Sequence, residues 1–266
     1  MKRIAWLTDI HLEFVSIETA LAFINQIAAL SPDMLLIGGD TGTARNLDFF
    51  LRTFDERIQC STLFVLGNHD FYHGSLERIH GLADEVSASS QWLRWLTAQG
   101  IIEITNSTCV LGHESWADGR LGNGMNSQVE LNDYYLIDEF IGLSRQERYQ
   151  KMGDLGDQAA EYLRRLLPQA CAAYQNILLL THVPPFRETC WHEGSISDDE
   201  FLPHFTCKAV GDTLKEIMLQ NPNAYLTVLC GHTHGHGEVD ILPNLHVKTG
   251  GATYGKPGIQ EIMLVE

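Results

Sequence analysis

Short runs rich in leucine and β-branched residues alternate along the chain with stretches of helical periodicity, and this alternation limits the possible folds more than any other feature. It is typical of α/β domains, in which helices cover a central sheet. The last third of the sequence contains more predicted strands than helices, which favours a mixed sheet or two packed sheets over a uniform parallel one. The predicted strands are 3–8, 34–37, 62–66, 101–105, 108–111, 177–180, 225–229, 245–249 and 259–264.

Helices are predicted between these strands where apolar residues recur on one helical face. The first predicted helix stops before Pro32, because the residue that precedes a proline disfavours the helical conformation. We interpret the apolar stripes as core packing. The predicted helices are 18–30, 47–58, 75–86 and 155–167.

Two long stretches, 115–153 and 184–211, fit no regular element well. Long irregular segments inside a compact domain are often lids or binding loops, but each could equally be an insertion that covers a sheet edge. With 266 residues the chain is within the range of one large α/β unit, so we expect a single domain over 1–266 with these two segments as candidate caps.

The chain carries 18 basic and 34 acidic side chains, a formal net charge of −16. Such a surface repels nucleic-acid backbones and anionic membranes, so neither broad nucleic-acid binding nor membrane association is expected. No stretch approaches the roughly 20 apolar residues of a membrane span, and Asp9 and His11 interrupt the N-terminal apolar residues before a signal peptide could be completed. The six cysteines are scattered without metal-site spacing. These features predict a cytoplasmic protein.

Polar residues follow several predicted strands at the point where each strand gives way to a loop. Because the carboxyl ends of strands in open α/β sheets converge on one edge, residues far apart in sequence are expected to meet there. Residues two apart on an extended chain point the same way, so Asp9 with His11, and His232 with His234, are each expected to face one site. The blocks are Asp9-Ile10-His11, Gly39-Asp40, Gly67-Asn68-His69-Asp70, Thr181-His182 and Gly231-His232-Thr233-His234.

The side chains in these blocks form a possible metal-ligand set of imidazoles, carboxylates and one amide, with no thiolate. Such a set suits manganese, iron or zinc, and two ions about 3.5–4 Å apart can hold both water and phosphoryl oxygens. Two divalent ions bring four positive charges against the two negative charges of Asp9 and Asp40, so the site would be positive on a negative protein.

The ordered set D-x-H, G-D, G-N-H-D, H and G-H-x-H resembles the signature of the calcineurin-like metallophosphoesterases. The resemblance implies two packed mixed β-sheets flanked by helices, a four-layer αββα sandwich. It also implies hydrolysis of a phosphate monoester or diester in a small phosphorylated substrate, by attack of a metal-bridging hydroxide. The implied ligands of one ion are Asp9, His11, Asp40 and His234, and those of the other are Asp40, Asn68, His182 and His232.

The same resemblance implies that His69 protonates the leaving oxygen or contacts the phosphate, and that Asp70 holds it. A loop-stabilising hydrogen bond is the alternative role for this pair. No tyrosine follows Gly39-Asp40 as in purple acid phosphatases, and the G-D-x-V-D-R-G block of protein phosphatases is missing, which argues against those activities. The run from Thr181 to Phe186 and the run from Trp191 to Gly194 resemble poorly characterised bacterial phosphohydrolases.

Other residues have both a functional and a structural interpretation. His113 and His192 are candidate substrate contacts, and Trp116 and Trp191 could stack on a substrate, although we favour a role in pinning loops. Arg120 and Lys208 could meet a second anionic group or be only solvated. A non-catalytic scaffold or protein-binding subunit of the same fold is the alternative function, and the oligomeric state has no signature in the sequence.

Overall fold

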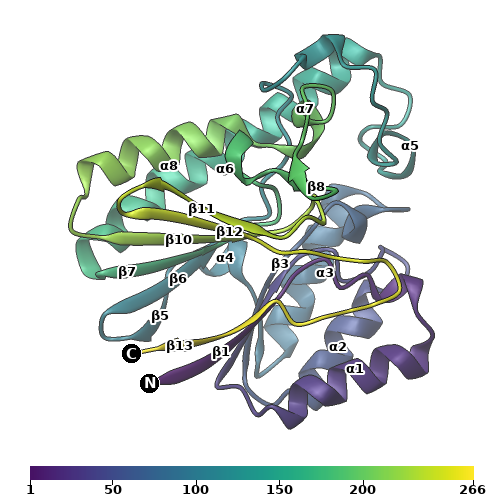
Figure 1. Ribbon diagram of the computed structural model, residues 1–266. Helices are drawn as coiled ribbons and strands as arrows, with labels where there is room; N and C mark the ends of the chain where they lie inside the picture. Colours follow the sequence, from purple (N-terminus) through teal and green to yellow (C-terminus); the bar gives the residue numbers. More distant parts are fainter.

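Two β-sheets pack face to face, and helices cover the outer side of each (Figure 1). The computed structural model describes residues 1–266. This four-layer arrangement is the predicted α/β fold with two mixed sheets flanked by helices. No helix is both long enough and apolar enough to cross a membrane.

The first sheet has the strand order β13-β1-β2-β3-β4, with β13 antiparallel to β1 and the other neighbours parallel. Two of its outer helices begin at serine caps: the Ser16 hydroxyl accepts a hydrogen bond from the amide of Thr19, and Ser75 does the same for Arg78. The elements are β1 (Lys2–Leu7), α1 (Ile17–Ala29), β2 (Met34–Gly38), α2 (Leu47–Arg57), β3 (Ser61–Val65), α3 (Leu76–Ser89), β4 (Leu93–Trp95), α4 (Leu96–Gln99) and β13 (Glu261–Val265).

The second sheet has the order β11-β12-β10-β7-β6-β5, in which β12, β10, β7 and β6 are parallel neighbours and the two edge strands are antiparallel. Helices α6 and α8 lie along its outer face (Figure 1). The elements are β5 (Ile102–Thr105), β6 (Thr108–Gly112), α6 (Arg145–Ala173), β7 (Asn176–Leu180), α8 (Lys208–Gln220), β10 (Tyr225–Cys230), β11 (Gly237–Leu242) and β12 (Leu245–Thr249).

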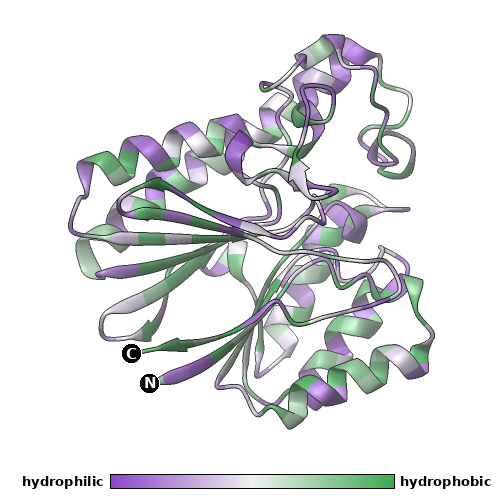
Figure 2. Cartoon of the chain, viewed as in Figure 1, coloured by the Kyte–Doolittle hydropathy of each residue, from purple (hydrophilic) through white to green (hydrophobic).

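Successive residues of the central strands are buried on opposite faces, so hydrophobic residues fill the space between the two sheets and the space between each sheet and its helices. In β1, Ile4 and Trp6 join the cluster that also contains Val110 and Leu180 of the second sheet, whereas Ala5 and Leu7 join the larger cluster that includes the helices. Figure 2 shows mostly hydrophobic colours along the central strands and alternating colours along the helices. Burying a large apolar side chain stabilises a fold by about 1.5–3 kcal/mol, so these layers fix the relative position of the two sheets.

The two irregular segments lie together above one end of the sheets (Figure 1). The amide of Asp118 donates to the carbonyl of Thr206, and the amide of Asn123 donates to that of Asp199. Short elements punctuate both segments: α5 (Asp133–Leu136), β8 (Trp191–His192), β9 (Ser195–Ile196) and α7 (Leu202–Phe205). We refer to 115–144 as the first cap segment and to 184–207 as the second.

Some boundaries differ from those that the sequence predicts. Helix α6 begins at Arg145, ten positions before the predicted start. The prediction missed this first part because residues 145–154 are mainly polar and carry no apolar stripe. Its true start has a capping box, in which Ser144 and Glu147 bond each other's backbone amides. Helix α8 and strands β4 and β11 were not predicted.

Candidate metal centre

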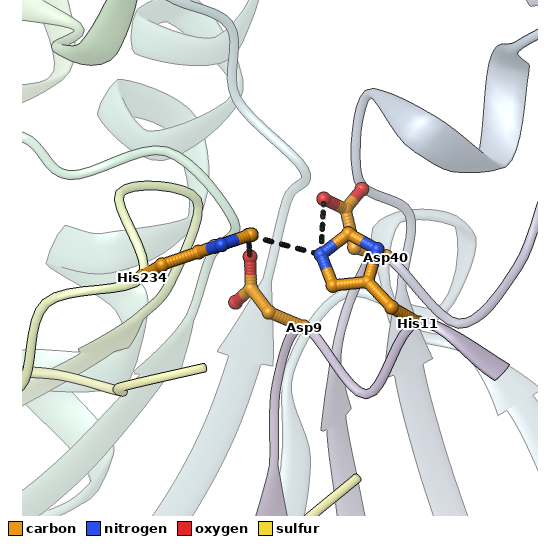
Figure 3. A group of neighbouring side chains, drawn as sticks. All are labelled: Asp9, His11, Asp40 and His234. Atoms are coloured by element: carbon orange, nitrogen blue, oxygen red, sulfur yellow. Dashed lines mark hydrogen bonds and ion pairs between the residues drawn. The ribbon is translucent and has the colours of Figure 1, made fainter. Parts of the chain in front are cut away.

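The predicted ligands all follow strands whose carboxyl ends reach the same edge of the two sheets. Strands β1, β2 and β3 are parallel neighbours in one sheet, and β7 and β10 are parallel neighbours in the other. The loops after these strands therefore meet where the sheets come together. Figure 3 shows Asp9, His11, Asp40 and His234 pointing toward one another from these loops.

The backbone at these loops is left-handed rather than extended. Of the nine non-glycine residues with positive φ, five are predicted ligands, with φ between 45° and 70°: Asp9, His11, Asp40, His232 and His234. The extended conformation assumed from the sequence is therefore wrong. A non-glycine residue in this region costs of order 1–3 kcal/mol, so the surrounding structure must hold these loops in place.

Two glycines allow the loops to approach each other closely. A Cβ at Gly67 would lie 2.2 Å from Oδ1 of Asp40, and a Cβ at Gly231 would lie 1.9 Å from Oδ2 of Asp9. Both distances are far below van der Waals contact, so no side chain fits at either position. The glycines in the G-N-H-D and G-H-T-H blocks are thus required by the carboxylates beside them.

One group of donor atoms consists of Asp9, His11, Asp40 and His234. The Nε2 atoms of His11 and His234 are 2.9 Å apart. Oδ1 of Asp9 lies 3.5 Å from Nε2 of His234, and Oδ2 of Asp40 lies 3.6 Å from Nε2 of His11. Convergence of two imidazole nitrogens and two carboxylate oxygens over these distances fits a divalent cation.

A second group adjoins the first. Oδ1 of Asn68 lies 3.0 Å from Nε2 of His182 and 2.9 Å from Nδ1 of His232. Oδ2 of Asp40 is 3.5 Å from Nε2 of His182, which places this one oxygen between the two groups. All seven predicted ligands therefore come together. His232 and His234 belong to different groups, which is the assignment that the family resemblance implies.

Burial favours the neutral form of three of these imidazoles. It lowers the pKa of His232 to about 3 and that of His234 to about 4, and it also lowers the pKa of His182. Burial, with the charges of Asp9 and Asp70, raises the pKa of Asp40 well above its usual value. Neutral imidazoles offer lone pairs near pH 7, and a buried carboxylate of this kind is stabilised by a cation.

Asp70 does not contact the His69 ring as predicted. Its carboxylate accepts hydrogen bonds from the amides of Gly67, Asp40, Thr41 and Gly42 at 2.8–3.0 Å. Burial nevertheless raises the pKa of Asp70 to about 7. Asp70 thus joins the loops after β2 and β3, which is the alternative role that the sequence left open.

Glu13 holds the His69 ring instead, and sequence reasoning missed it. Oε1 of Glu13 lies 3.1 Å from Nδ1 of His69 and 3.1 Å from Nδ1 of His11. Burial alone would raise the pKa of Glu13, but the hydrogen bonds from both histidines outweigh it and bring the pKa to about 2. The ring of His69 also stacks on Tyr72, with centroids 4.2 Å apart. The only signal in the sequence was a carboxylate two residues after Asp9-Ile10-His11.

Asp133, in the first cap segment, is the second residue that sequence reasoning missed. Its Oδ1 accepts hydrogen bonds from Nδ2 of Asn68 at 2.9 Å and from the hydroxyl of Tyr72 at 2.7 Å. These bonds orient the Asn68 amide so that its oxygen faces His182 and His232. Nothing in the local sequence distinguishes Asp133 from the other acidic residues of an irregular segment.

An open cleft of about 240 Å³ lies over the two donor groups. Its lining includes His69 and His192, so His192 has the position of a possible substrate contact; its ring nitrogen Nδ1 is also 3.1 Å from the carbonyl of Thr233. The full lining is Asp40, Asn68, His69, Tyr72, Leu131, Asn132, Asp133, His192, Phe205, His232, Thr233, His234 and Tyr254.

The remaining sequence candidates have structural contacts outside this cleft. His113 accepts a hydrogen bond from the amide of Ser115, and Trp116 is buried against Phe140. Trp191 packs against the backbone of Gly237, as expected of a residue that pins a loop.

The two candidate cations are likewise engaged elsewhere. Arg120 pairs with Asp118 and Asp157, and Lys208 pairs with Asp212. Neither cation lines the cleft over the donor groups.

Comparisons with known proteins agree with this geometry. The sequence profile described as calcineurin-like phosphoesterase matches residues 2–236. No curated protein gives a match. Among solved structures, phosphopantetheinyl hydrolase from Mycobacterium tuberculosis is 15% identical with a TM-score of 0.64, covering 93% of this chain and 89% of that one. A dimetal phosphatase from Danio rerio is 12% identical with a TM-score of 0.60, covering 96% and 88%. Because these sequence identities are low, the structural likeness shows a shared fold alone.

Proposed function

Because this chain belongs to the calcineurin-like phosphoesterase family, we propose that it hydrolyses phosphate esters with two divalent metal ions held at the strand ends. The observation that carries the proposal is the position of Asp40, whose Oδ2 lies within 3.6 Å of an imidazole nitrogen from each donor group. Two groups that share one carboxylate are the arrangement expected of a dimetal centre. Manganese, iron or zinc suits these ligands.

Divalent ions bound there would polarise the phosphoryl oxygens and lower the pKa of a bound water, so that hydroxide is available near neutral pH. The protein holds the ligands in fixed positions. Asp70 joins two of the ligand loops, and Glu13 and Asp133 orient His11 and Asn68. Side chains that are already positioned need no rearrangement when substrate binds.

His69 is the residue that we assign to the leaving group. Glu13 engages its Nδ1, which leaves Nε2 as the nitrogen available to the substrate, and the side chain lines the cleft. A histidine in this position can donate a proton or a hydrogen bond to the oxygen that leaves phosphorus. Because it is not one of the proposed metal ligands, its contribution can be separated from metal binding.

The experiment that tests this function combines metal titration with an activity panel. Metal-free protein reconstituted with manganese should bind two ions per chain by calorimetry and hydrolyse phosphate esters. Asp40→Asn should weaken both sites, since the shared carboxylate loses its charge, whereas Asn68→Ala should chiefly weaken one. A single bound ion in the intact protein would contradict the proposal. Two bound ions without hydrolysis of any ester would favour the scaffold alternative.

A further inference from the structure

The cleft over the metal centre contains no lysine or arginine. Its lining has two carboxylates, Asp40 and Asp133, together with apolar surface from Leu131, Phe205 and Tyr254. Cations elsewhere in the cap segments are paired: Arg120 with Asp157, and Arg187 with Asp199. Apart from its imidazoles, no side chain of the cleft can therefore bring positive charge to an anionic substrate.

The carboxylates close to the proposed ligands also reduce the positive charge of the centre. Glu13 and Asp133 each lie within hydrogen-bond distance of a proposed ligand. Two divalent ions would bring four positive charges, and Asp9, Asp40, Glu13 and Asp133 would bring four negative ones. The sequence alone indicated only two of these carboxylates. The four carboxylates would thus balance the charge of the two ions, so a second negative charge on the substrate would meet no net positive charge.

We propose, on the basis of the function proposed above, that this cleft selects phosphodiesters over phosphate monoesters. A diester carries one negative charge, whereas a terminal phosphate carries about −1.5 to −2 at neutral pH. The additional charge of the monoester would need a lysine or arginine that the cleft does not supply. The second ester group of a diester is uncharged and can lie against the apolar lining.

A matched pair of ligands without a scissile ester tests this inference by binding alone. Phenylphosphonate is a dianion above neutral pH, and methylphenylphosphinate is a monoanion in which a methyl group replaces one oxygen. Calorimetry with the manganese-loaded protein should show that methylphenylphosphinate binds at least about tenfold more tightly, as expected from one uncompensated charge. Equal or tighter binding of phenylphosphonate would overturn the inference.

A new cation in the cleft should reverse this preference. Asn132 lines the cleft and its side chain makes no hydrogen bond, so Asn132→Lys adds a positive charge there without removing a contact. Asn223→Lys, in the exposed turn before β10, adds the same charge at the opposite end of the strands and serves as the matched control. Only Asn132→Lys should strengthen phenylphosphonate binding; an equal effect of both variants would contradict a local charge deficit.

One nearby lysine provides a further check. Lys256 is exposed and lines a neighbouring hollow together with Asp9 and His234. Lys256→Ala should leave the binding of both ligands unchanged, and a weaker affinity for phenylphosphonate alone would show that the chain does supply a cation for a dianion.

Hydrolysis assays with phosphate monoesters and diesters distinguish a failure of the diester inference from a failure of the proposed function. If monoesters are cleaved as well as diesters, the function stands and the diester inference is wrong. If no phosphate ester is cleaved, both fail.

Discussion

In the proposed mechanism, His69 is the residue that acts on the leaving group. Its ring is held on one side by Glu13 and stacked on the other against Tyr72, so its orientation is fixed before substrate arrives. A fixed general acid contributes about 10² to 10⁴ to the rate of a reaction whose leaving group needs a proton.

His69→Asn should therefore retain both metals and slow the reaction in a manner that depends on the leaving group. An alkyl alcohol leaves poorly without a proton, so its ester should lose about 10² to 10⁴ in rate, whereas a nitrophenyl ester should lose much less. Rates for the two esters, with metal content measured on the same samples, check this. If the rates for both esters fell by the same factor, His69 would instead position the phosphate.

Glu13→Gln should affect the metal centre and His69 together, because one carboxylate oxygen serves both His11 and His69. Loss of a carboxylate behind a metal-binding histidine typically lowers metal affinity about 10- to 100-fold. The variant should also show the leaving-group dependence of His69→Asn in a milder form. Calorimetric metal titration and the same two esters measure these effects.

Glu56→Gln is the matched control, since Glu56 is exposed on α2 and its side chain makes no hydrogen bond. It should behave like the unmodified protein. Unchanged metal affinity in Glu13→Gln, with equal slowing of both esters, would assign Glu13 a structural role only.

At this scale the sequence predicted which side chains would gather, but not how each one is held. The seven proposed ligands could be identified because they follow predicted strands in an ordered set. Glu13 and Asp133 could not, because a carboxylate becomes a partner of His69 or Asn68 only through contacts between distant segments. Asp70 was assigned to its sequence neighbour His69, whereas its actual partners are backbone amides of two loops.

Among the elements, the first cap segment contributes Leu131, Asn132 and Asp133 to the lining of the cleft. It reaches the loop after β3 through backbone hydrogen bonds from His73 to Leu136 and from Asp138 to Gly74, and through the carboxylate of Asp133. The segment that the sequence left irregular is thus connected to the Asn68 loop. That it also acts as a lid stays a prediction.

Asp133→Asn should weaken the metal held by Asn68 more than the other, because the uncharged amide oxygen accepts more weakly from Asn68 and Tyr72 than the carboxylate oxygen does. We expect a loss of about 10- to 100-fold in the affinity of one of the two ions, seen as two separated phases in a calorimetric titration. Asp138→Asn, an exposed neighbour with no side-chain hydrogen bond, is the control. Equal weakening of both ions would argue against this local effect.

The second cap segment cannot be removed as a unit, although it contains no proposed ligand. The carbonyl of His204 lies 3.1 Å from Nε2 of His232, and Leu202 and Phe205 are buried with Cys190 in a small cluster. These contacts were invisible from the sequence because the segment has no periodic apolar pattern. The exposed turn between β8 and β9 makes none of these contacts, so it can be shortened without disturbing them.

For the molecule as a whole, Glu114 links the second sheet to the helices of the first. It follows β6 in the second sheet, yet its carboxylate accepts a hydrogen bond from Thr97 of α4 and lies 3.0 Å from Nε2 of His80 on α3. Burial raises the pKa of Glu114, but the charge of His113 and the contacts with His80 and Thr97 outweigh it and bring the pKa to about 2.

Glu114→Gln should lower the free energy of unfolding by about 1.5–3 kcal/mol at neutral pH, the usual contribution of a hydrogen bond to a charged group. Because folding lowers this pKa, the stabilisation is complete above pH 4.5, the ordinary value for glutamate, and is lost as the pH falls toward about 2. The difference between the two proteins in denaturant unfolding should narrow over that range. Glu216→Gln, exposed on α8, should show no such difference at any pH.

The left-handed backbone at Asp9, His11, Asp40, His232 and His234 has a consequence for how such a site is inherited. Glycine adopts this conformation without steric strain, so replacing any one of these residues by glycine would relieve strain in the metal-free fold. Stability of the metal-free fold and metal binding therefore place opposite demands on these five positions, and a glycine at any of them would trade a proposed ligand for a less strained loop.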